Sequence, residues 1–215
     1  MRNLLAWRWI FFVGGMMIMS LGISLTIKGK DLGISPWDVL HVGLFEKLGL
    51  TIGSWSIITG FLIVTVTSIA MRQWPRGGTW LNMMVIGLFI DFFNWILPDA
   101  HSYTEQIIYF VLGVIVAGYG VGVYVSPNLG AGPRDSLMLL FVDKLGWSLR
   151  AVRTAIEAIV AFIGFLLGGP IGIGTLLIVV CSGQIIQVAL PQCRKVLLKI
   201  TNQPDETALL KYKQA

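Results

Sequence analysis

Two short segments of the chain place an aspartate two residues after a proline. Residues 35–38 read SPWD, and residues 132–135 read GPRD. Proline suits the first position of a helix, where no amide hydrogen is needed, and an acid two residues later can accept hydrogen bonds from free amides of the first turn. Each motif therefore predicts a helix start with a carboxylate, Asp38 or Asp135, beside it. A helix N-terminus of this kind can bind a substrate or an ion.

The composition places these motifs in a membrane protein. Hydrophobic residues make up 55% of the 215 residues and charged residues only 13%, whereas soluble domains contain about 25% charged residues. Lipid must therefore cover most of the surface. The basic pI of about 9.4 is explained by cytoplasmic loops beside an anionic leaflet, so no nucleic-acid partner is expected.

Two interpretations of the repeated aspartates are open. Asp38 and Asp135 could cap helices that lie at the membrane interface, since such a cap contributes about 1 kcal/mol, with Ser35 and Asp38 forming a capping box. Alternatively, both helices are re-entrant, and their N-termini frame a substrate or ion site near the midplane. Glycine allows the close backbone approach that the second arrangement needs; the motif residues concerned are Gly33, Pro36, Gly130 and Pro133.

A third polar position occurs within the apolar segments. Asp91 falls about midway along an apolar run, and Gln187 occupies the matching position near the end of the chain. A charge at the bilayer centre is costly and usually faces a partner or a wet cavity. We therefore expect Asp91 and Gln187 near the substrate. The alternative is a span that ends earlier and leaves Asp91 near the outer interface.

Other chemistry-bearing residues give weaker signals. Arg153 and Glu157 are four residues apart and can pair on one helical face, either as a solvated pair or as a gate. His41 follows Asp38 by three residues and could titrate near neutral pH. The sequence contains two cysteines and shows no nucleophile motif, phosphate loop or metal-ligand spacing. We therefore expect no enzyme activity, cofactor or metal.

The elements that position these residues follow from the charge-free runs. A helix needs about 20 mostly apolar residues to cross the bilayer, and six such runs occur, at about 9–27, 52–71, 78–97, 106–126, 150–168 and 171–190. Two further segments, about 33–50 and 130–146, are too short and too charged to cross. We predict an all-α polytopic protein with six transmembrane helices and two short re-entrant or interfacial helices. Residues 1–199 form one membrane domain, and residues 200–215 form a polar cytoplasmic tail.

The two short segments belong to an internal repeat. The pattern LGxxPxDxL, followed by KLG, occurs at residues 32–49 and again at residues 129–146, at an offset of 97. A weaker match at an offset of 96 relates residues 78–90 to residues 174–186. The repeats cover about 9–97 and 106–190. Each contains three spans, an odd number, so the second repeat must enter the membrane from the opposite side. Inverted repeats of this kind are frequent in secondary transporters.

The distribution of basic residues sets the orientation. With the N-terminus inside, thirteen of the 16 lysines and arginines fall on the cytoplasmic side, as the positive-inside rule requires. Both termini are therefore expected in the cytoplasm.

The repeated motif also marks a family resemblance. The segment DLGISPWDVLHVGL at residues 31–44 resembles the YczE/YyaS/YitT-like bacterial membrane proteins, and the likeness extends over the whole chain. The resemblance implies a multi-pass protein of the bacterial plasma membrane. It implies no biochemical activity and transfers no ligand residues.

Two functions from different classes fit these observations. The first is a secondary transporter of a small molecule or an ion, working as a homodimer, with the substrate between the two Pro-Asp motifs; a channel is a third possibility, since bundles of two repeats can also form pores. The second is a scaffold that docks cytoplasmic enzymes through the basic loop 134–153 and the tail 194–215. The scaffold predicts tolerance of substitutions at Asp91, whereas the transporter predicts an aqueous path to the motifs.

Overall fold

The chain is entirely helical over the residues that the structure describes. The structure is a computed structural model covering residues 2–75, 77–130 and 132–203. A single 3-10 turn, η1 (Lys30–Leu32), follows the first helix. The α-helices of the described residues are α1 (Arg2–Lys28), α2 (Pro36–Leu48), α3 (Ile52–Met71), α4 (Gly77–Ile96), α5 (Tyr103–Val125), α6 (Pro133–Leu145), α7 (Leu149–Leu166) and α8 (Ile173–Ile200). The predicted all-α class is confirmed.

Five helices are long and apolar enough to cross a bilayer, namely α1, α3, α4, α5 and α8. They coincide with five of the six predicted spans. The remaining one, α7, has only 18 residues and includes Arg150, Arg153 and Glu157, so length and composition alone do not mark it as a span. The chain is an integral membrane protein.

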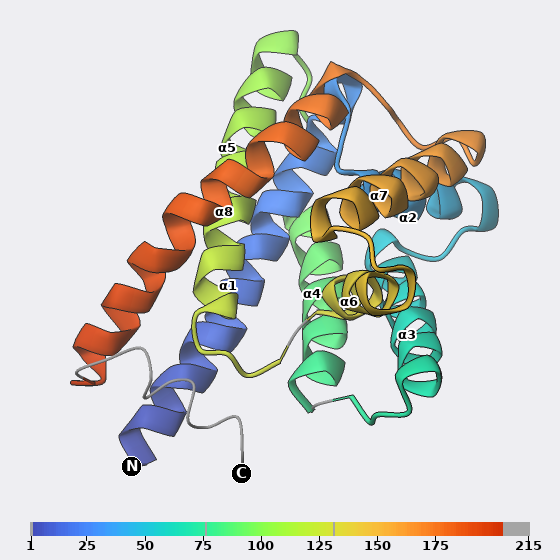
Figure 1. The fold of residues 1–215 in the computed structure, drawn as a ribbon. Helices are drawn as coiled ribbons and strands as arrows, with labels where there is room; N and C mark the ends of the chain where they lie inside the picture. The colour runs from blue at the N-terminus through green and yellow to red at the C-terminus, as the bar shows by residue number, and fades with distance from the viewer. Residues whose placement is uncertain (1, 76, 131, 204–215) are drawn as a thin grey trace.

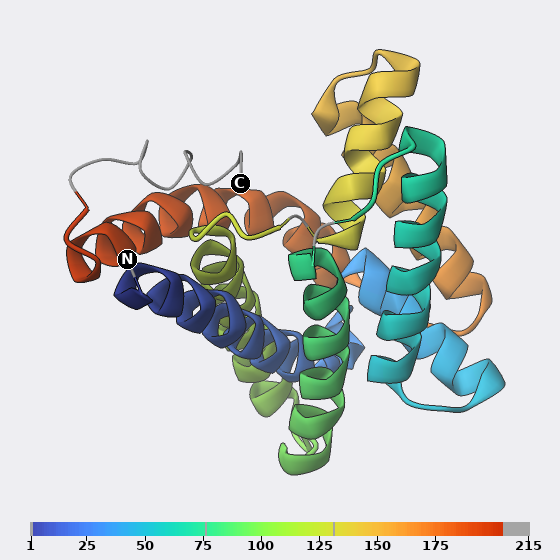
Figure 2. The ribbon, with the colours of Figure 1, turned by 90° about the horizontal axis from the view of Figure 1, so that it is seen from below.

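The helices form two groups that meet along one side. In the first group α1 packs along α5, α4 packs on α1 and α8 packs on α5; in the second, α2 and α6 each pack against both α3 and α7. Figure 2 shows the two groups side by side, and the α3–α4 hairpin joins them. Figure 1 shows the start of α1 and the end of α8 at the same end of the molecule.

Glycines allow α1 and α5 to approach closely. Gly22 lies so near α5 that a Cβ there would be 2.7 Å from the Ala117 Cα. Gly15 is in the same position relative to Tyr124, further along α5, so the two helices run antiparallel. Small residues at such crossings are typical of membrane bundles.

The helix pairs on either side of this crossing run parallel. The Ser20 and Ser24 hydroxyls of α1 lie 3.2 Å from the carbonyl oxygens of Ile86 and Ile90 of α4, respectively. On the other side, α5 and α8 run in the same direction, because Gly118 of α5 lies against Ile185 of α8 and Gly122 of α5 lies against Ala189 of α8.

The two short helices begin at the predicted prolines, but the predicted capping box at Ser35 is wrong. Ser35 is the N-cap of α2, yet its side chain makes no capping hydrogen bond, and the Asp38 Oδ1 lies 3.8 Å from the His41 Nδ1. In the second motif the Asp135 Oδ2 accepts a 3.2 Å hydrogen bond from the Gly132 amide. The two copies therefore share their helix start and differ in the use of the carboxylate.

The last helix extends further than expected. α8 continues to Ile200, past the predicted end of the span at residue 190, with Pro191 inside it. The prediction followed the apolar run, whereas the helix itself continues through the basic residues Arg194, Lys195 and Lys199. Of the predicted tail 200–215, residues 204–215 lie outside the described residues.

Candidate functional site

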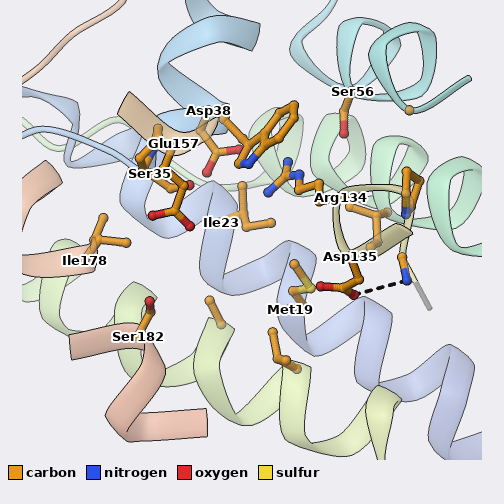
Figure 3. A pocket seen from close by; sticks show the side chains of 18 of the residues that line it. Met19, Ile23, Ser35, Asp38, Ser56, Arg134, Asp135, Glu157, Ile178 and Ser182 are labelled. Atoms are coloured by element: carbon orange, nitrogen blue, oxygen red, sulfur yellow. Dashed lines mark hydrogen bonds between the residues drawn. The ribbon is translucent and has the colours of Figure 1, made fainter. Parts of the chain in front are cut away.

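A cavity of about 240 Å³ lies where the two helix groups meet. Every α-helix contributes to its wall, for example through Met19 of α1, Ser56 of α3, Met83 of α4, Ala117 of α5 and Ser182 of α8. Figure 3 shows part of this wall from close by. The volume is below the range of about 300–1,000 Å³ for drug-sized ligands, and it is enough for several waters or a small solute.

Both Pro-Asp motifs open into this cavity. Residues 35–38 at the start of α2 and residues 132–135 at the start of α6 line it together, and Figure 3 shows Asp38, Arg134 and Asp135 around one space. The sequence had suggested that the two motifs meet, and the fold brings them together because α2 and α6 both pack on α3 and α7.

The first motif contains a buried polar cluster. Asp38 and His41 are each 1% exposed, and the Asp38 Oδ1 lies 3.8 Å from the His41 Nδ1. The other ring nitrogen of His41 lies 2.9 Å from the Thr59 hydroxyl of α3. The Asp38 Oδ1, the His41 Nδ1 and the Trp37 indole nitrogen have no hydrogen-bond partner among the described residues. Buried polar atoms without a partner are uncommon and call for an explanation.

The second motif contributes an arginine and a carboxylate to the same wall. The Arg134 guanidinium lies 5.0 Å from the centre of the Trp37 ring, a cation–π distance. Asp135 is exposed and lines the cavity.

An ion pair from α7 completes the charged wall. The Arg153 Nε donates a 2.8 Å hydrogen bond to the Glu157 Oε1, and the Arg153 Nη2 lies 3.4 Å from the Ser182 hydroxyl of α8. Both residues of the pair line the cavity. Within the described residues, no group of three or more His, Cys, Asp or Glu side chains could hold a metal ion.

The other two predicted site residues do not line the cavity. The Asp91 Oδ1 accepts a 2.8 Å hydrogen bond from the Gly53 amide, and the Asp91 Oδ2 lies 2.6 Å from the Thr51 hydroxyl. Asp91 thus binds the first turn of α3, while α4 itself continues to Ile96. Gln187 is exposed on α8, while its neighbour Ile186 faces the cavity.

Sequence reasoning missed one cationic group of the site. The charge count assigned Arg134 to a cytoplasmic loop, whereas it lines the cavity. Arg153, which was expected to pair with Glu157 near the start of a span, makes that pair and lines the cavity as well. One signal could have identified Arg134: it lies between the repeated proline and aspartate, at the position that Trp37 occupies in the first copy.

Comparison with known proteins places the chain in a family. A model of the Family of unknown function (DUF6198) matches residues 6–191. The chain is 53% identical over 197 residues to the "Uncharacterized membrane protein YczE" of Bacillus subtilis (strain 168), covering 92% of each chain. It is 32% identical to the "Uncharacterized protein YyaS" of the same strain, covering 86% of this chain and 92% of the relative.

A third relative comes from another genus. It is an "Uncharacterized protein" of Haemophilus influenzae (strain ATCC 51907 / DSM 11121 / KW20 / Rd), 34% identical over 79% of this chain and 77% of the relative. No solved structure matches the chain. The matched length and the identities show that the chain belongs to the Family of unknown function (DUF6198).

Proposed function

We propose that the protein is a secondary transporter of a small polar molecule or ion in the bacterial plasma membrane, and that the cavity is its substrate site. The observation that supports this most directly is the cavity wall, to which α2, α6 and α7 contribute three carboxylates and two guanidinium groups. Ionisable groups inside a membrane protein are costly and usually mark a substrate or ion path.

Helix packing supports the inverted repeat that the proposal requires. α1 and α5 occupy matching places in the two repeats and run antiparallel. Ile86 follows Ser20 by 66 residues at the α1–α4 contact, and Ile185 follows Gly118 at the α5–α8 contact, a separation of 67. In the repeat, α2 corresponds to α6 and α3 corresponds to α7. The contact of α2 with α7 therefore has a counterpart in the contact of α6 with α3, and both contacts are present.

The same arrangement supports six spans with both termini in the cytoplasm. In this proposal α7 crosses the membrane although it contains charges, because Arg153 and Glu157 face the cavity rather than lipid. If Arg134 and Arg153 are removed from the positive-inside count, eleven basic residues remain inside against three outside, so the orientation is unchanged.

Transport would follow from rocking of one helix group against the other. The cavity lies between α1, α4, α5 and α8 on one side and α2, α3, α6 and α7 on the other, which is where alternating-access transporters of inverted repeats bind substrate. A gradient or an energising partner would drive the cycle, since the sequence contains no phosphate-binding loop.

Thiol accessibility tests this proposal. Single cysteines replace Ser56 and Ser182 in a background without Cys181 and Cys193, and Leu88→Cys, at a position 62% exposed on α4, is the lipid-facing control. An impermeant thiol reagent is added to intact cells and to inverted vesicles. We expect both cavity cysteines to react from at least one side and the control not to react.

The opposite result would favour the scaffold. If a permeant reagent labels the two cavity cysteines and the impermeant reagent labels neither from either side, the cavity has no aqueous path and the transporter proposal fails.

We also propose that the protein forms a homodimer through α8. Gln184 and Gln187 are exposed on this helix, and both lie near the middle of its apolar part, residues 173–193. An amide that faces lipid lacks hydrogen-bond partners, and amides across a helix–helix interface can satisfy each other. A second copy of the chain would supply those partners.

A further inference from the structure

The buried cluster of the first motif contains two hydrogen-bond acceptors that face each other. The Thr59 hydroxyl has one hydrogen, and the Trp55 and Ser56 carbonyl oxygens lie 2.8 and 3.2 Å from its oxygen. When the hydrogen is donated to either carbonyl, the Thr59 oxygen accepts the 2.9 Å hydrogen bond from the His41 Nε2. A neutral imidazole with its proton on Nε2 has a bare Nδ1, and this Nδ1 lies 3.8 Å from the Asp38 Oδ1.

Nothing in the described residues supplies a donor to this pair. The Asp38 Oδ1 and the His41 Nδ1 have no hydrogen-bond partner, and neither atom is reachable by water. Two buried acceptors that face each other are unfavourable, because both have lost hydration without gaining a hydrogen bond. The smallest donor that resolves this is a single proton on either the imidazole or the carboxyl.

We propose that Asp38 and His41 form a proton-binding site in the wall of the cavity, and that this proton is the coupling ion. The coupling role rests on the proposed transport function; the proton site itself does not. When the two side chains share a proton, one of them becomes a hydrogen-bond donor and the other accepts from it. Because the two atoms are 3.8 Å apart, only a small shift of the side chains is needed to form this hydrogen bond.

Arg134 connects the proton site to the substrate space. It interacts electrostatically with Asp38, but no ion pair within 4.0 Å joins them among the described residues. When Asp38 is ionised, Arg134 compensates its charge. When the site holds a proton, the positive charge of Arg134 is available to an anionic group in the cavity. Binding of proton and anionic group would thus favour each other, and such coupling is reciprocal.

The other charged groups around the site are accounted for. From α6, Arg134 and Asp135 face the cavity, and from α7 the paired Arg153 and Glu157 do so. The residues of α3 that line the same part of the wall, Ser56 and Thr59, are uncharged. None of these groups donates to the His41 Nδ1.

The histidine content of the chain makes a direct test possible. Only two histidines occur, and His101 lies exposed in the loop before α5. The full-length protein with His101→Gln, labelled with ¹⁵N-histidine and reconstituted in lipid bilayers, therefore reports on His41 alone. Magic-angle-spinning NMR distinguishes a protonated from a bare ring nitrogen. Spectra are recorded from pH 4 to pH 9, and the unsubstituted protein supplies the His101 signal as an internal reference for an exposed histidine.

We expect the His41 Nδ1 signal to pass from the protonated or hydrogen-bonded position at low pH to the bare position at high pH, while Nε2 keeps its proton throughout. Asp38→Asn should shift the midpoint of this transition by at least about one pH unit relative to the unsubstituted protein. Asp91→Asn, which removes a carboxylate outside the cavity, should leave it unchanged.

Two results would overturn the inference. One is a bare Nδ1 at every pH; the other is the same transition in Asp38→Asn and in the unsubstituted protein. Thermal midpoints of the variants show that they are folded, and Thr59→Val gives a second check, since loss of the Nε2 acceptor should alter the Nδ1 transition.

If the NMR result fails while Ser56→Cys and Ser182→Cys still react, transport uses another ion. If the NMR result holds while those cysteines stay inaccessible, the transport function fails and the proton site remains.

Discussion

The Asp91 carboxylate and the Thr51 hydroxyl lie 2.6 Å apart and join the end of α4 to the start of α3. Asp91 also accepts a 2.8 Å hydrogen bond from the Gly53 amide. It therefore satisfies an otherwise free amide of the first turn of α3. An aspartate in an apolar helix here caps a neighbouring helix instead of contacting the cavity.

Replacement of Asp91 should therefore affect stability and not the site. We expect Asp91→Ala to lower the free energy of unfolding by about 1–2 kcal/mol, because a capping acceptor is lost. Asp91→Asn keeps one acceptor oxygen and should cost less. Thermal unfolding in detergent measures both. If either variant instead abolished thiol access to Ser56→Cys while remaining folded, Asp91 would belong to the functional path after all.

The difference between Asp91 and the motif aspartates shows what a sequence can predict. Pro36 and Pro133 define helix starts locally, so the positions of Asp38 and Asp135 relative to their helices followed from the motif alone. Repetition at a constant offset then suggested that both copies have related environments. Which side of α4 or α8 faces the cavity depends on packing with α1 and α5, and no periodicity in an almost uniformly apolar helix contains that information.

The positions of the charged cavity residues also depend on the folded chain and could not be predicted from the sequence. In the sequence Arg134 resembles a loop cation, because it has polar neighbours, and Arg153 is expected only to pair with Glu157 on one helical face. Only the folded chain shows that α6 starts inside the molecule and that α7 turns Arg153 toward Ser182 of α8. Likewise, the 2.9 Å contact of the His41 Nε2 with the Thr59 hydroxyl joins residues 18 positions apart.

The adjacent glycines of α1 provide a matched pair for testing the α1–α5 crossing. A Cβ on Gly15 would lie 2.7 Å from the Tyr124 Cα, whereas a Cβ on Gly14 would have nothing within 4 Å. We expect Gly15→Ala to destabilise the protein by about 1–3 kcal/mol through overpacking. Gly14→Ala should be neutral or slightly stabilising, because alanine favours the helix. Thermal midpoints measured side by side decide this, and equal effects would contradict the close crossing.

Arg8 ties the start of α1 to the loop that leads into the second motif. Its Nε and Nη2 donate hydrogen bonds of 3.0 and 2.6 Å to the Pro127 carbonyl oxygen, and its side chain is buried. We expect Arg8→Gln to cost about 1–3 kcal/mol, since hydrogen bonds from a charged donor are lost in a buried position. Arg8→Lys, which keeps a single charged donor, should recover part of the loss in the same unfolding assay. Equal stability of all three proteins would contradict this role.

The loop before α5 should contribute a small, pH-dependent stability. The Glu105 Oε2 accepts hydrogen bonds from the His101 and Ser102 amides at 2.7 and 3.2 Å. An ionised carboxylate is a stronger acceptor than a protonated carboxyl or an amide, so this stabilisation is lost when acid protonates Glu105. We expect the thermal midpoint of Glu105→Gln to fall below that of the unsubstituted protein at neutral pH. The two midpoints should converge in acid; a difference that stayed constant would show that the charge is irrelevant.

The proposed dimer can be tested with a native cysteine. Cys181 lies three residues before Gln184 on α8, so both share one face of the helix. In a Cys193→Ala background, a short membrane-permeant bis-maleimide should join two Cys181 side chains in the native membrane and give a covalent dimer on gels. Gln184→Leu combined with Gln187→Leu removes the amides that we expect to pair across the interface, and the dimer band should then weaken severalfold. A chain without Cys181 but with Leu88→Cys on α4 controls for random collisions, since its exposed side chain lies on a different helix. If that control cross-links as strongly as Cys181, or if the leucine variant is unchanged, α8 does not form the interface.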